Sequence, residues 1–378
     1  MCLSEVQEYL NDKTEIVSLR LGDSTVLVAP CWCGRVMTSA CNESGEDFGW
    51  INRGHIDWGG SDPRFNNYGG EERMWLSPEG GQFSLWFKPG AEQVYENWYT
   101  PPALNETPFE VSRQTETSVG MTTRMELENA SAIRFALDVT RDVEIVDRPK
   151  IAAWFDKAVA EMIDGMTLDV VGYQTTGTVT NTGDSWTRDG GLISIWILSQ
   201  LQAAPNMRIV MPVRRGSVEE LGPVAKSDYF GDIPADRISV TEEGVTLQAD
   251  GSFRAKIGTS PARTVGVIGA VDMQAGRLTL ARFDMPEQPE ASIYMDNMWG
   301  GPHTNPFVGD AANAYNDGAG EGGGTPSFFE LESLSPTQEL NTGESIRHSH
   351  CTAHFLGDPD EIRTLCHAAL GIDPEGLS

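Results

Sequence analysis

Short strand-like segments fill most of the sequence and limit the folds that the chain can adopt. They lie within residues 15–30, 82–90, 173–183, 191–201, 208–216, 245–258, 264–285 and 292–299, each bounded by Gly, Pro, Asn or Asp. Those four residues are typical of turns. Because no helical segments separate the strands, the pattern favours an antiparallel sandwich or barrel over a parallel α/β sheet. The run LISIWIL around Trp196 is apolar on both faces, as in a central strand of a layered sheet.

Helical periodicity is confined to the two ends of the chain. Residues 3–10 predict one short amphipathic helix. Near the C-terminus, Asp358 is a favoured N-cap, and the Pro that follows it suits the first position of a helix. No shift in composition marks a boundary, so we expect one domain over residues 1–378, with a helix in residues 358–378 docked on it. The Gly-rich residues 316–326 form either a loop that reaches over a site or a plain connection.

The charge of the chain excludes two classes of partner. The formal net charge is -28 over 378 residues, whereas nucleic acids and anionic membranes bind basic surfaces. We therefore expect neither as a partner. No apolar run reaches the roughly 18 residues of a membrane-spanning helix, and the first residues lack the basic and apolar regions of a signal peptide. The expected location is the cytoplasm, or the periplasm if a signal peptide has been removed.

Two segments near the C-terminus carry titratable side chains at strand spacing. In FFELESL, the two-residue period of a strand places Glu330 and Glu332 on one face, and in RHSHCTAH it does the same for His348 and His350. If the two strands are neighbours in one sheet, these groups could pair a carboxylate base with an imidazole acid. They could also bind a divalent metal through His348, His350 and Glu330. Otherwise we expect no cofactor, and an exposed polar strand face is the remaining alternative.

Three segments mix aromatic and polar side chains in a way that suits a hydroxyl-rich ligand. The candidate binding residues are Asn67, Tyr68, Arg73 and Trp75 in NNYGGEERMW, and Tyr294, Asn297, His303, Tyr315 and Asp317 in residues 292–318. Aromatic faces pack on sugar rings, while Asn and Asp hydrogen-bond to hydroxyl groups. A turn with a surface ion pair and a large aromatic β core are the alternatives.

Four segments together resemble a bacterial family of unassigned function in the galactose mutarotase-like, or aldose 1-epimerase-like, superfamily. They are NNYGGEERMWLSPEGGQFSLWF, VTNTGDSWTRDGGLISIWIL, NAYNDG and FFELESLSPTQELNTGESIRHSHCTAHF, and the resemblance spans roughly residues 66–355. It implies an all-β fold, a large antiparallel β-supersandwich with a sugar-binding face, to which the C-terminal helix is added.

The resemblance also implies roles for individual residues. In aldose 1-epimerases, a Glu on a late strand removes the proton of the anomeric hydroxyl while a His protonates the ring oxygen. Glu332 matches the position of that Glu, and Glu330 lies on the same face of the strand. The His-containing motifs in the middle of those enzymes have no counterpart, because residues 91–274 contain no His. The acid would then be His348, His350, His303 or a Tyr.

These observations together predict a carbohydrate-active protein whose partner is a mono-, oligo- or polysaccharide. Our first expectation is an aldose 1-epimerase-like enzyme that acts on a free or terminal sugar. A second is a polysaccharide lyase or glycoside hydrolase acting on a modified or uronate-containing glycan, in which Arg73 with Asn67, or a metal, would hold the carboxylate. A third is a carbohydrate-binding protein without catalytic activity.

Overall fold

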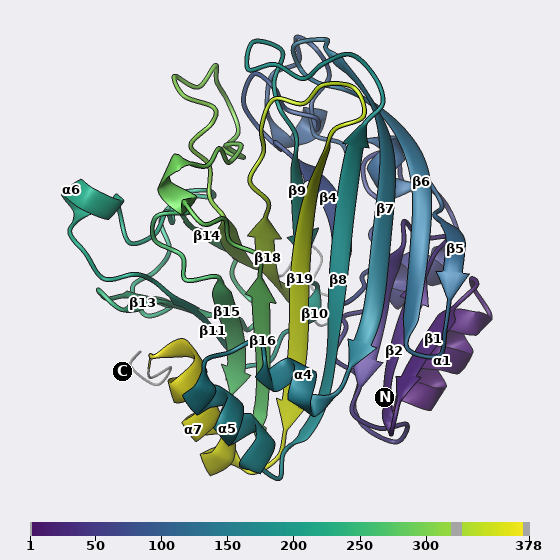
Figure 1. The fold of residues 1–378 in the computed structure, drawn as a ribbon, viewed down its shortest axis with the longest axis vertical. Helices are drawn as coiled ribbons and strands as arrows, with labels where there is room; N and C mark the ends of the chain where they lie inside the picture. The colour runs from purple at the N-terminus through teal and green to yellow at the C-terminus, as the bar shows by residue number, and fades with distance from the viewer. Residues whose placement is uncertain (1, 319–326, 373–378) are drawn as a thin grey trace.

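Two large antiparallel sheets stacked face to face form the body of the protein (Figure 1). The structure is a computed structural model that describes residues 2–318 and 327–372. The predicted mobile loop over a site lies largely outside the described residues. The all-β supersandwich that the sequence predicts is confirmed. That residues 1–378 form a single domain stays a prediction.

The larger sheet has ten strands, and its hydrogen-bonded neighbours run antiparallel. Across the sheet the order is β12 (Ile238–Val240), β13 (Gly244–Gln248), β11 (Arg208–Pro212), β15 (Val267–Asp272), β16 (Arg277–Phe283), β19 (Ser345–Leu356), β8 (Asp169–Asn181), β7 (Arg134–Val146), β6 (Ser118–Glu128) and β5 (Glu110–Gln114).

The second sheet packs against one face of the first. Its order is β14 (Ala255–Thr259), β17 (Ala312–Asn316), β18 (Phe328–Leu334), β9 (Ser194–Leu198) and β4 (Arg73–Ser77), and β10 (Leu201–Gln202) also pairs with β18. A small third sheet near the N-terminus contains β1 (Val17–Leu21), β2 (Ser24–Ala29) and β3 (Arg35–Ala40). The apolar run around Trp196 forms β9, an internal strand as predicted.

The helices are short. They are α1 (Leu3–Asn11), α2 (Arg53–Trp58), α3 (Pro102–Asn105), α4 (Arg148–Ala152), α5 (Lys157–Gly165), α6 (Val218–Leu221) and α7 (Pro359–Leu370), with 3-10 turns η1 (Tyr95–Asn97) and η2 (Pro289–Ala291). Asp358 caps α7 as predicted, because its side chain accepts hydrogen bonds from the backbone of Asp360 and Glu361. The sequence did not predict α5, which packs beside α7 on the ten-stranded sheet (Figure 1). None of the helices among the described residues is long and apolar enough to cross a membrane.

Strand alternation determines which side chains of the six-stranded sheet face the ten-stranded sheet. Met74, Ile195 and Leu331 point inward and are buried. The two sheets approach closely at Gly177 on β8, where an added Cβ would lie 2.6 Å from the sulfur of Met74. The intervening residues of each strand therefore lie on the opposite face of the six-stranded sheet, which we call the outer face.

Two strand predictions are wrong. Residues 82–90 and 292–299 form no strand, and the strand nearest to the first of them is β4. Residues 83–87, apolar except for Ser84, form a buried loop, in which Trp86 packs against Trp75 with ring centroids 4.4 Å apart. The indole N–H of Trp86 donates to the carbonyl of Leu76 at 3.1 Å. A short apolar run does not by itself distinguish a strand from a loop buried in this way.

Candidate functional site

The outer face of the six-stranded sheet carries polar and aromatic side chains from every main strand. The register places Lys256 opposite Tyr315 and Tyr315 opposite Glu330, and it places Asn313 opposite Glu332. On the other side of β18, Trp196 lies opposite Trp75. Directly paired residues share a face, so the outer face comprises Lys256, Asn313, Tyr315, Glu330, Glu332, Trp196, Arg73, Trp75 and Ser77.

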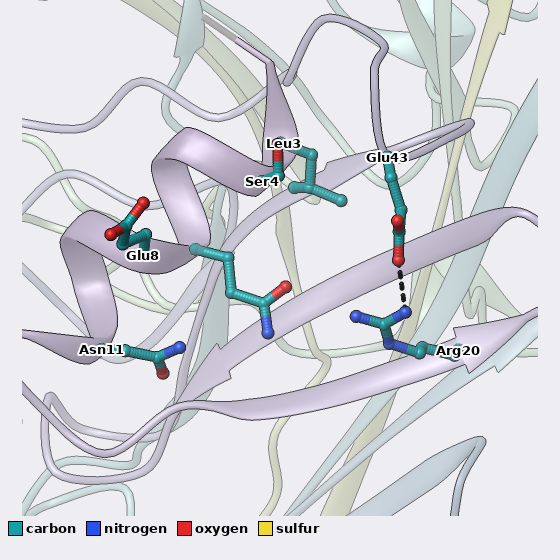
Figure 2. A pocket seen from close by; sticks show the side chains of 7 residues that line it. Leu3, Ser4, Glu8, Asn11, Arg20 and Glu43 are labelled. Atoms are coloured by element: carbon teal, nitrogen blue, oxygen red, sulfur yellow. Dashed lines mark hydrogen bonds and ion pairs between the residues drawn. The ribbon is translucent and has the colours of Figure 1, made fainter.

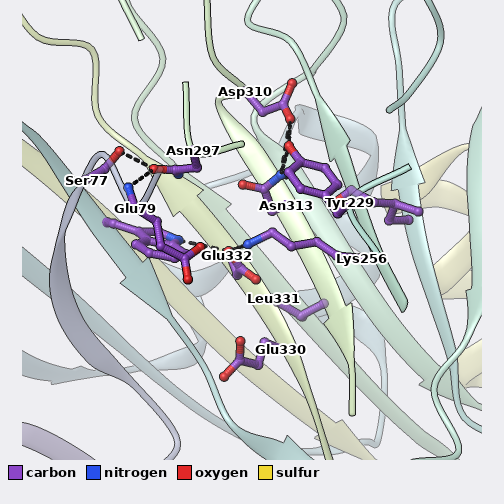
Figure 3. A network of polar contacts seen from close by, with 12 residues as sticks. Ser77, Glu79, Tyr229, Lys256, Asn297, Asp310, Asn313, Glu330, Leu331 and Glu332 are labelled. Carbon is purple, nitrogen blue, oxygen red and sulfur yellow. Dashed lines mark hydrogen bonds and ion pairs between the residues drawn. The ribbon is translucent and has the colours of Figure 1, made fainter. Parts of the chain in front are cut away.

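Glu332 is at the centre of this face and is fully buried. Its Oε2 accepts hydrogen bonds from Nζ of Lys256 at 3.0 Å (Figure 3) and from the indole N–H of Trp196 at 2.9 Å. Its Oε1 has no hydrogen-bond partner among the described residues. The carboxylate is therefore held through one oxygen, while the other is a buried acceptor without a partner among the described residues.

Glu79 brings a second carboxylate to Glu332 from the loop that follows β4. Figure 3 shows the two carboxylates close together, and Oε1 of Glu79 accepts from the indole N–H of Trp98 at 3.0 Å. Burial and the charge of Glu332 raise the pKa of Glu79, although the ammonium of Lys256 opposes this. Burial lowers the pKa of Lys256, but the carboxylates of Glu332 and Glu79 outweigh it and raise that pKa overall. Lys256 thus stays charged, and Glu79 retains a proton more readily than an ordinary Glu.

Glu330 and Arg73 form a buried ion pair beside this group. Nη2 of Arg73 lies 2.8 Å from Oε1 of Glu330. Burial raises the pKa of Glu330 to about 7 against the opposing charge of Arg73. The guanidinium of Arg73 also packs over the ring of Trp75, 4.1 Å from its centroid. The two Glu residues of β18 therefore have different electrostatic environments, since Glu330 pairs with Arg73 and Glu332 pairs with Lys256.

A third polar group joins Tyr229, Asp310 and Asn313. The hydroxyl of Tyr229 donates to Asp310, and the side-chain amide of Asn313 lies 3.3 Å from both (Figure 3). Burial raises the pKa of Asp310, although Nζ of Lys226, 3.5 Å from its Oδ1, opposes the shift. The ring of Tyr229 lies 5.6 Å from Nζ of Lys256. This group is therefore continuous with the group around Glu332.

A cavity of about 370 Å³ opens next to Asp310. Lys226, Tyr294 and Phe307 contribute to its wall. Its volume is in the range of small-molecule sites. The hydroxyl of Tyr294, a predicted binding residue, has no hydrogen-bond partner among the described residues.

The predicted sharing of one surface by the glutamates and the histidines is wrong. His348 and His350 belong to β19 in the ten-stranded sheet, and both contact the hydroxyl of Ser333, at 2.8 and 2.9 Å. Ser333 lies between the sheets because it follows Glu332 on β18 and therefore faces the other way. Burial lowers the pKa of His348 to about 4 and that of His350 to about 3, so both are neutral.

The same geometry contradicts the predicted metal alternative. Glu330 is on the outer face of β18, whereas His348 and His350 approach β18 from between the sheets. One ion cannot contact all three side chains in this arrangement. The described part of the chain contains no group of three or more His, Cys, Asp or Glu suited to a metal ion.

The remaining predicted residues are distributed around the outer face and beyond it. Asn297 supports the site, since its Oδ1 accepts from the Ser77 hydroxyl and from the backbone N–H of Glu79, both at 2.7 Å (Figure 3). Tyr315 donates to Asp317 at 2.9 Å.

Three predicted binding residues do not project from the outer face. Asn67 accepts from the amide of Gln200 at 3.2 Å. Tyr68 stacks on Trp32 in the N-terminal apolar cluster, with ring centroids 4.6 Å apart. His303 lies in a loop, 3.2 Å from Asp296.

Comparison with known proteins assigns the chain to a family. Residues 3–377 match the sequence model described as "Family of unknown function (DUF6786)". The chain belongs to DUF6786. None of the curated proteins compared with it matches.

Solved structures give the fold of this DUF6786 chain. A protein from Escherichia coli K12, described as a candidate aldose 1-epimerase, has 11% sequence identity and a TM-score of 0.51 over 91% of this chain and 99% of its own. A galactose mutarotase-like protein from Lactobacillus casei also has 11% identity and a TM-score of 0.51, over 90% of this chain and 100% of its own. The fold of this chain is thus galactose mutarotase-like, as the sequence resemblance implies.

Several site residues of this DUF6786 chain are not predicted by sequence patterns. Lys256 is the one charged residue of the apolar strand β14, and that isolation could have identified it. Glu79 and Tyr229 occupy loops, where no periodicity indicates a direction. Trp196 was assigned to the core from its apolar neighbours, although its indole N–H reaches Glu332.

A second hollow in this DUF6786 chain, of about 330 Å³, lies beside α1. Figure 2 shows Glu43 and Arg20 paired across part of it. Its wall is formed by Leu3, Ser4, Gln7, Glu8, Asn11, Arg20 and Glu43. Both charged groups of the pair are substantially exposed, and an exposed pair of this kind contributes little. We therefore place the candidate site on the outer face.

Proposed function

We propose that the outer face binds a sugar and that the protein interconverts its anomers, as an aldose 1-epimerase-like enzyme. The observation that carries this proposal is the state of Glu332. One of its oxygens is fixed by Lys256 and Trp196, and the other lacks a partner among the described residues. A general base must hold its carboxylate within hydrogen-bond reach of the proton that it removes.

The proposed reaction needs a base and an acid. Glu332 takes the proton of the anomeric hydroxyl, the bond between the anomeric carbon and the ring oxygen breaks, and the ring oxygen takes a proton from the acid. The open-chain aldehyde then rotates about the bond between its first two carbons, and the former ring oxygen attacks its other face. During this closure the acid takes back its proton and Glu332 returns its proton to the new anomeric hydroxyl, so both groups regain their starting protonation states. Glu79 suits the role of acid because its raised pKa favours the protonated form and its carboxyl lies beside that of Glu332.

Aromatic side chains support the choice of a sugar. Trp75, Trp86, Trp98 and Trp196 form a continuous cluster, with successive ring centroids 4.4 to 6.1 Å apart. Indole faces pack well on the apolar face of a sugar ring. Trp196 and Trp98 also donate to Glu332 and Glu79, so the same cluster orients both proposed catalytic groups.

Anomer exchange measured by NMR tests this proposal. Wild-type protein should accelerate exchange for at least one sugar in a panel of aldoses and uronic acids. Glu332→Gln should reduce this rate by about 10² or more, the usual contribution of a general base. Glu242→Gln makes the same substitution at an exposed position and should leave the rate unchanged.

Two results would contradict the epimerase-like reaction. The first is exchange that is equally fast in Glu332→Gln and wild type. The second is release of unsaturated uronates or new reducing ends from glycans without anomer exchange, which would favour a lyase or a hydrolase.

A further inference from the structure

Three arginine side chains are fully buried among the described residues, and they differ in how their charge is compensated. Arg263 donates to the backbone carbonyls of Arg214, Gly216, Ser217 and Gly222 at 2.6 to 3.2 Å. Arg141 pairs with the carboxylate of Glu72, at 2.8 Å between Nη2 and Oε1, although its Nε and Nη1 have no partner among the described residues. These two show how the fold accommodates a structural guanidinium. The third, Arg35, has neither a paired carboxylate nor a set of carbonyl acceptors among the described residues.

Arg35 makes a single side-chain hydrogen bond within the described part of the chain, from Nη1 to the carbonyl of Gly69 at 2.8 Å. Its Nε and Nη2 have no partner there. The ring of Tyr68 lies 5.6 Å from the guanidinium and compensates only part of its charge. Burial and nearby Arg73 lower the pKa of Arg35 to about 10, so it remains charged at neutral pH. A buried charge without a counter-ion is costly to retain.

Arg73 is a second cation beside Arg35, because Val36 and Glu72, the residues next to them, form an antiparallel bridge. Its side chain lies on the outer face. Its Nη2 pairs with Glu330, but its Nε and Nη1 have no partner among the described residues. Because the pKa of Glu330 is about 7, that carboxylate neutralises Arg73 only in part near neutral pH. Four guanidinium N–H-bearing atoms, two from each arginine, are thus left without acceptors. The group that is missing beside these two arginines is therefore an anion.

We propose that the ligand of the outer face is an acidic sugar, a uronic acid, whose carboxylate binds between Arg35 and Arg73. This inference rests on the proposed function and specifies its substrate class. Planar guanidinium forks match a carboxylate in a bidentate manner. The site gives a chain of net charge -28 a local region of positive charge for an acidic ligand. Because Arg35 has no exposed surface, residues 66–70, which supply its carbonyl acceptor, must shift when the carboxylate binds.

Calorimetry and thermal denaturation with defined sugars test the inference. The probes are D-glucuronate and D-galacturonate, with D-glucose and D-galactose as neutral counterparts and D-glucose 6-phosphate as a phosphate counterpart. At least one uronate should bind about tenfold or more tightly than its neutral counterpart, as expected for hydrogen bonds between charged groups. It should also raise Tm by binding to the folded state.

Variants at Arg35 test whether this residue causes the preference for uronates over neutral sugars. Arg35→Met should reduce the preference for the uronate to about twofold or less, and its Tm without sugar should equal or exceed that of wild type, because an uncompensated charge is removed. Arg35→Lys keeps the charge but loses the fork, so an intermediate preference is expected even if Arg35→Met does not fold. Arg124→Met, at a side chain that is 89% exposed, is the matched control.

Several outcomes would overturn the inference. They are equal affinity for uronates and neutral sugars, tighter binding of glucose 6-phosphate than of either uronate, and an unchanged preference in both Arg35 variants. Anomer exchange of neutral sugars without a preference for uronates would remove this inference and leave the proposed function intact. Uronate binding that depends on Arg35, without any anomer exchange, would support this inference and contradict the proposed epimerase-like reaction.

Discussion

At the scale of single residues, the site depends on how charges are shared among carboxylates. Lys256 pairs with Glu332 and Arg73 pairs with Glu330, so two glutamates on one face of one strand receive different environments. Glu79 adds a third carboxylate without a cation of its own at ion-pair distance among the described residues. Such divergence is how proteins obtain a base and an acid from the same residue type.

Lys256→Met should destabilise the protein strongly. The variant leaves the carboxylate of Glu332 buried without its cation, and breaking a buried pair in this way typically costs about 3–5 kcal/mol. Urea denaturation should show this loss in the free energy of unfolding. The double variant Lys256→Met with Glu332→Gln should recover part of it. Lys157→Met, at an exposed helix position, should change stability little. A single Lys256 variant as stable as wild type would contradict the pairing.

His350→Gln should make the protein less sensitive to acid. The pKa of His350 is about 3 in the folded protein against an ordinary value of 6.5. The unfolded chain therefore binds the proton first, and folding stability falls as the pH drops below about 6.5. Between pH 7 and pH 5 this residue should account for a loss of about 2 kcal/mol.

Urea denaturation at both pH values measures this effect. The loss between pH 7 and pH 5 should be smaller in His350→Gln than in wild type. His367→Gln on the exposed face of α7 is the control and should leave the loss unchanged. An identical loss in wild type and His350→Gln would show that His350 is not buried in its neutral form.

At the scale of elements, β14 shows how tightly the outer face is fitted. Gly258 on β14 lies opposite Asn313, and an added Cβ would be 2.1 Å from the nearest oxygen of Asp310. The absence of a side chain at this position therefore allows Asp310 and Asn313 to meet Tyr229.

Gly258→Ala should disrupt this polar group. We expect a loss of about 1–3 kcal/mol in the free energy of unfolding, as for other overpacked sites, together with weaker sugar binding. Gly165→Ala is a suitable control, since an added Cβ there meets nothing within 4 Å. Both quantities can be measured by denaturation and calorimetry. Wild-type values for both in Gly258→Ala would mean that the strand shifts freely.

The elements also explain which parts of the site the sequence could predict. The two-residue period placed Glu330 and Glu332 on one face, because that relation is local to β18. The same period placed His348 and His350 together, again correctly within β19. The wrong prediction was that the two strands present these side chains on one shared surface. The sheet that each strand joins depends on long-range pairing, of β18 with β9 and β17 and of β19 with β8 and β16, and no local pattern records it.

At the scale of the whole molecule, the stacked sheets separate two kinds of buried polarity. Between the sheets, Glu71 accepts from Ser39 at 2.8 Å and lies 2.8 Å from Nε2 of His354, which in turn contacts Thr279 at 2.9 Å. This chain of contacts joins β3 to β16 and β19, so it links the small sheet to the largest one. The histidines that the sequence analysis considered catalytic belong to this interior, whereas the outer face carries the proposed chemistry.

The role of Glu332 as the general base is tested by comparing Glu332→Gln with Glu330→Gln on one confirmed sugar. Turnover is measured by NMR exchange and Kd by calorimetry for both variants. Glu332→Gln should lower turnover by about 10² or more while Kd changes little, since Gln keeps the shape but cannot accept the proton. Glu330→Gln should alter Kd more than turnover, because its partner is Arg73. Near wild-type turnover in Glu332→Gln would show that Glu332 is not the general base.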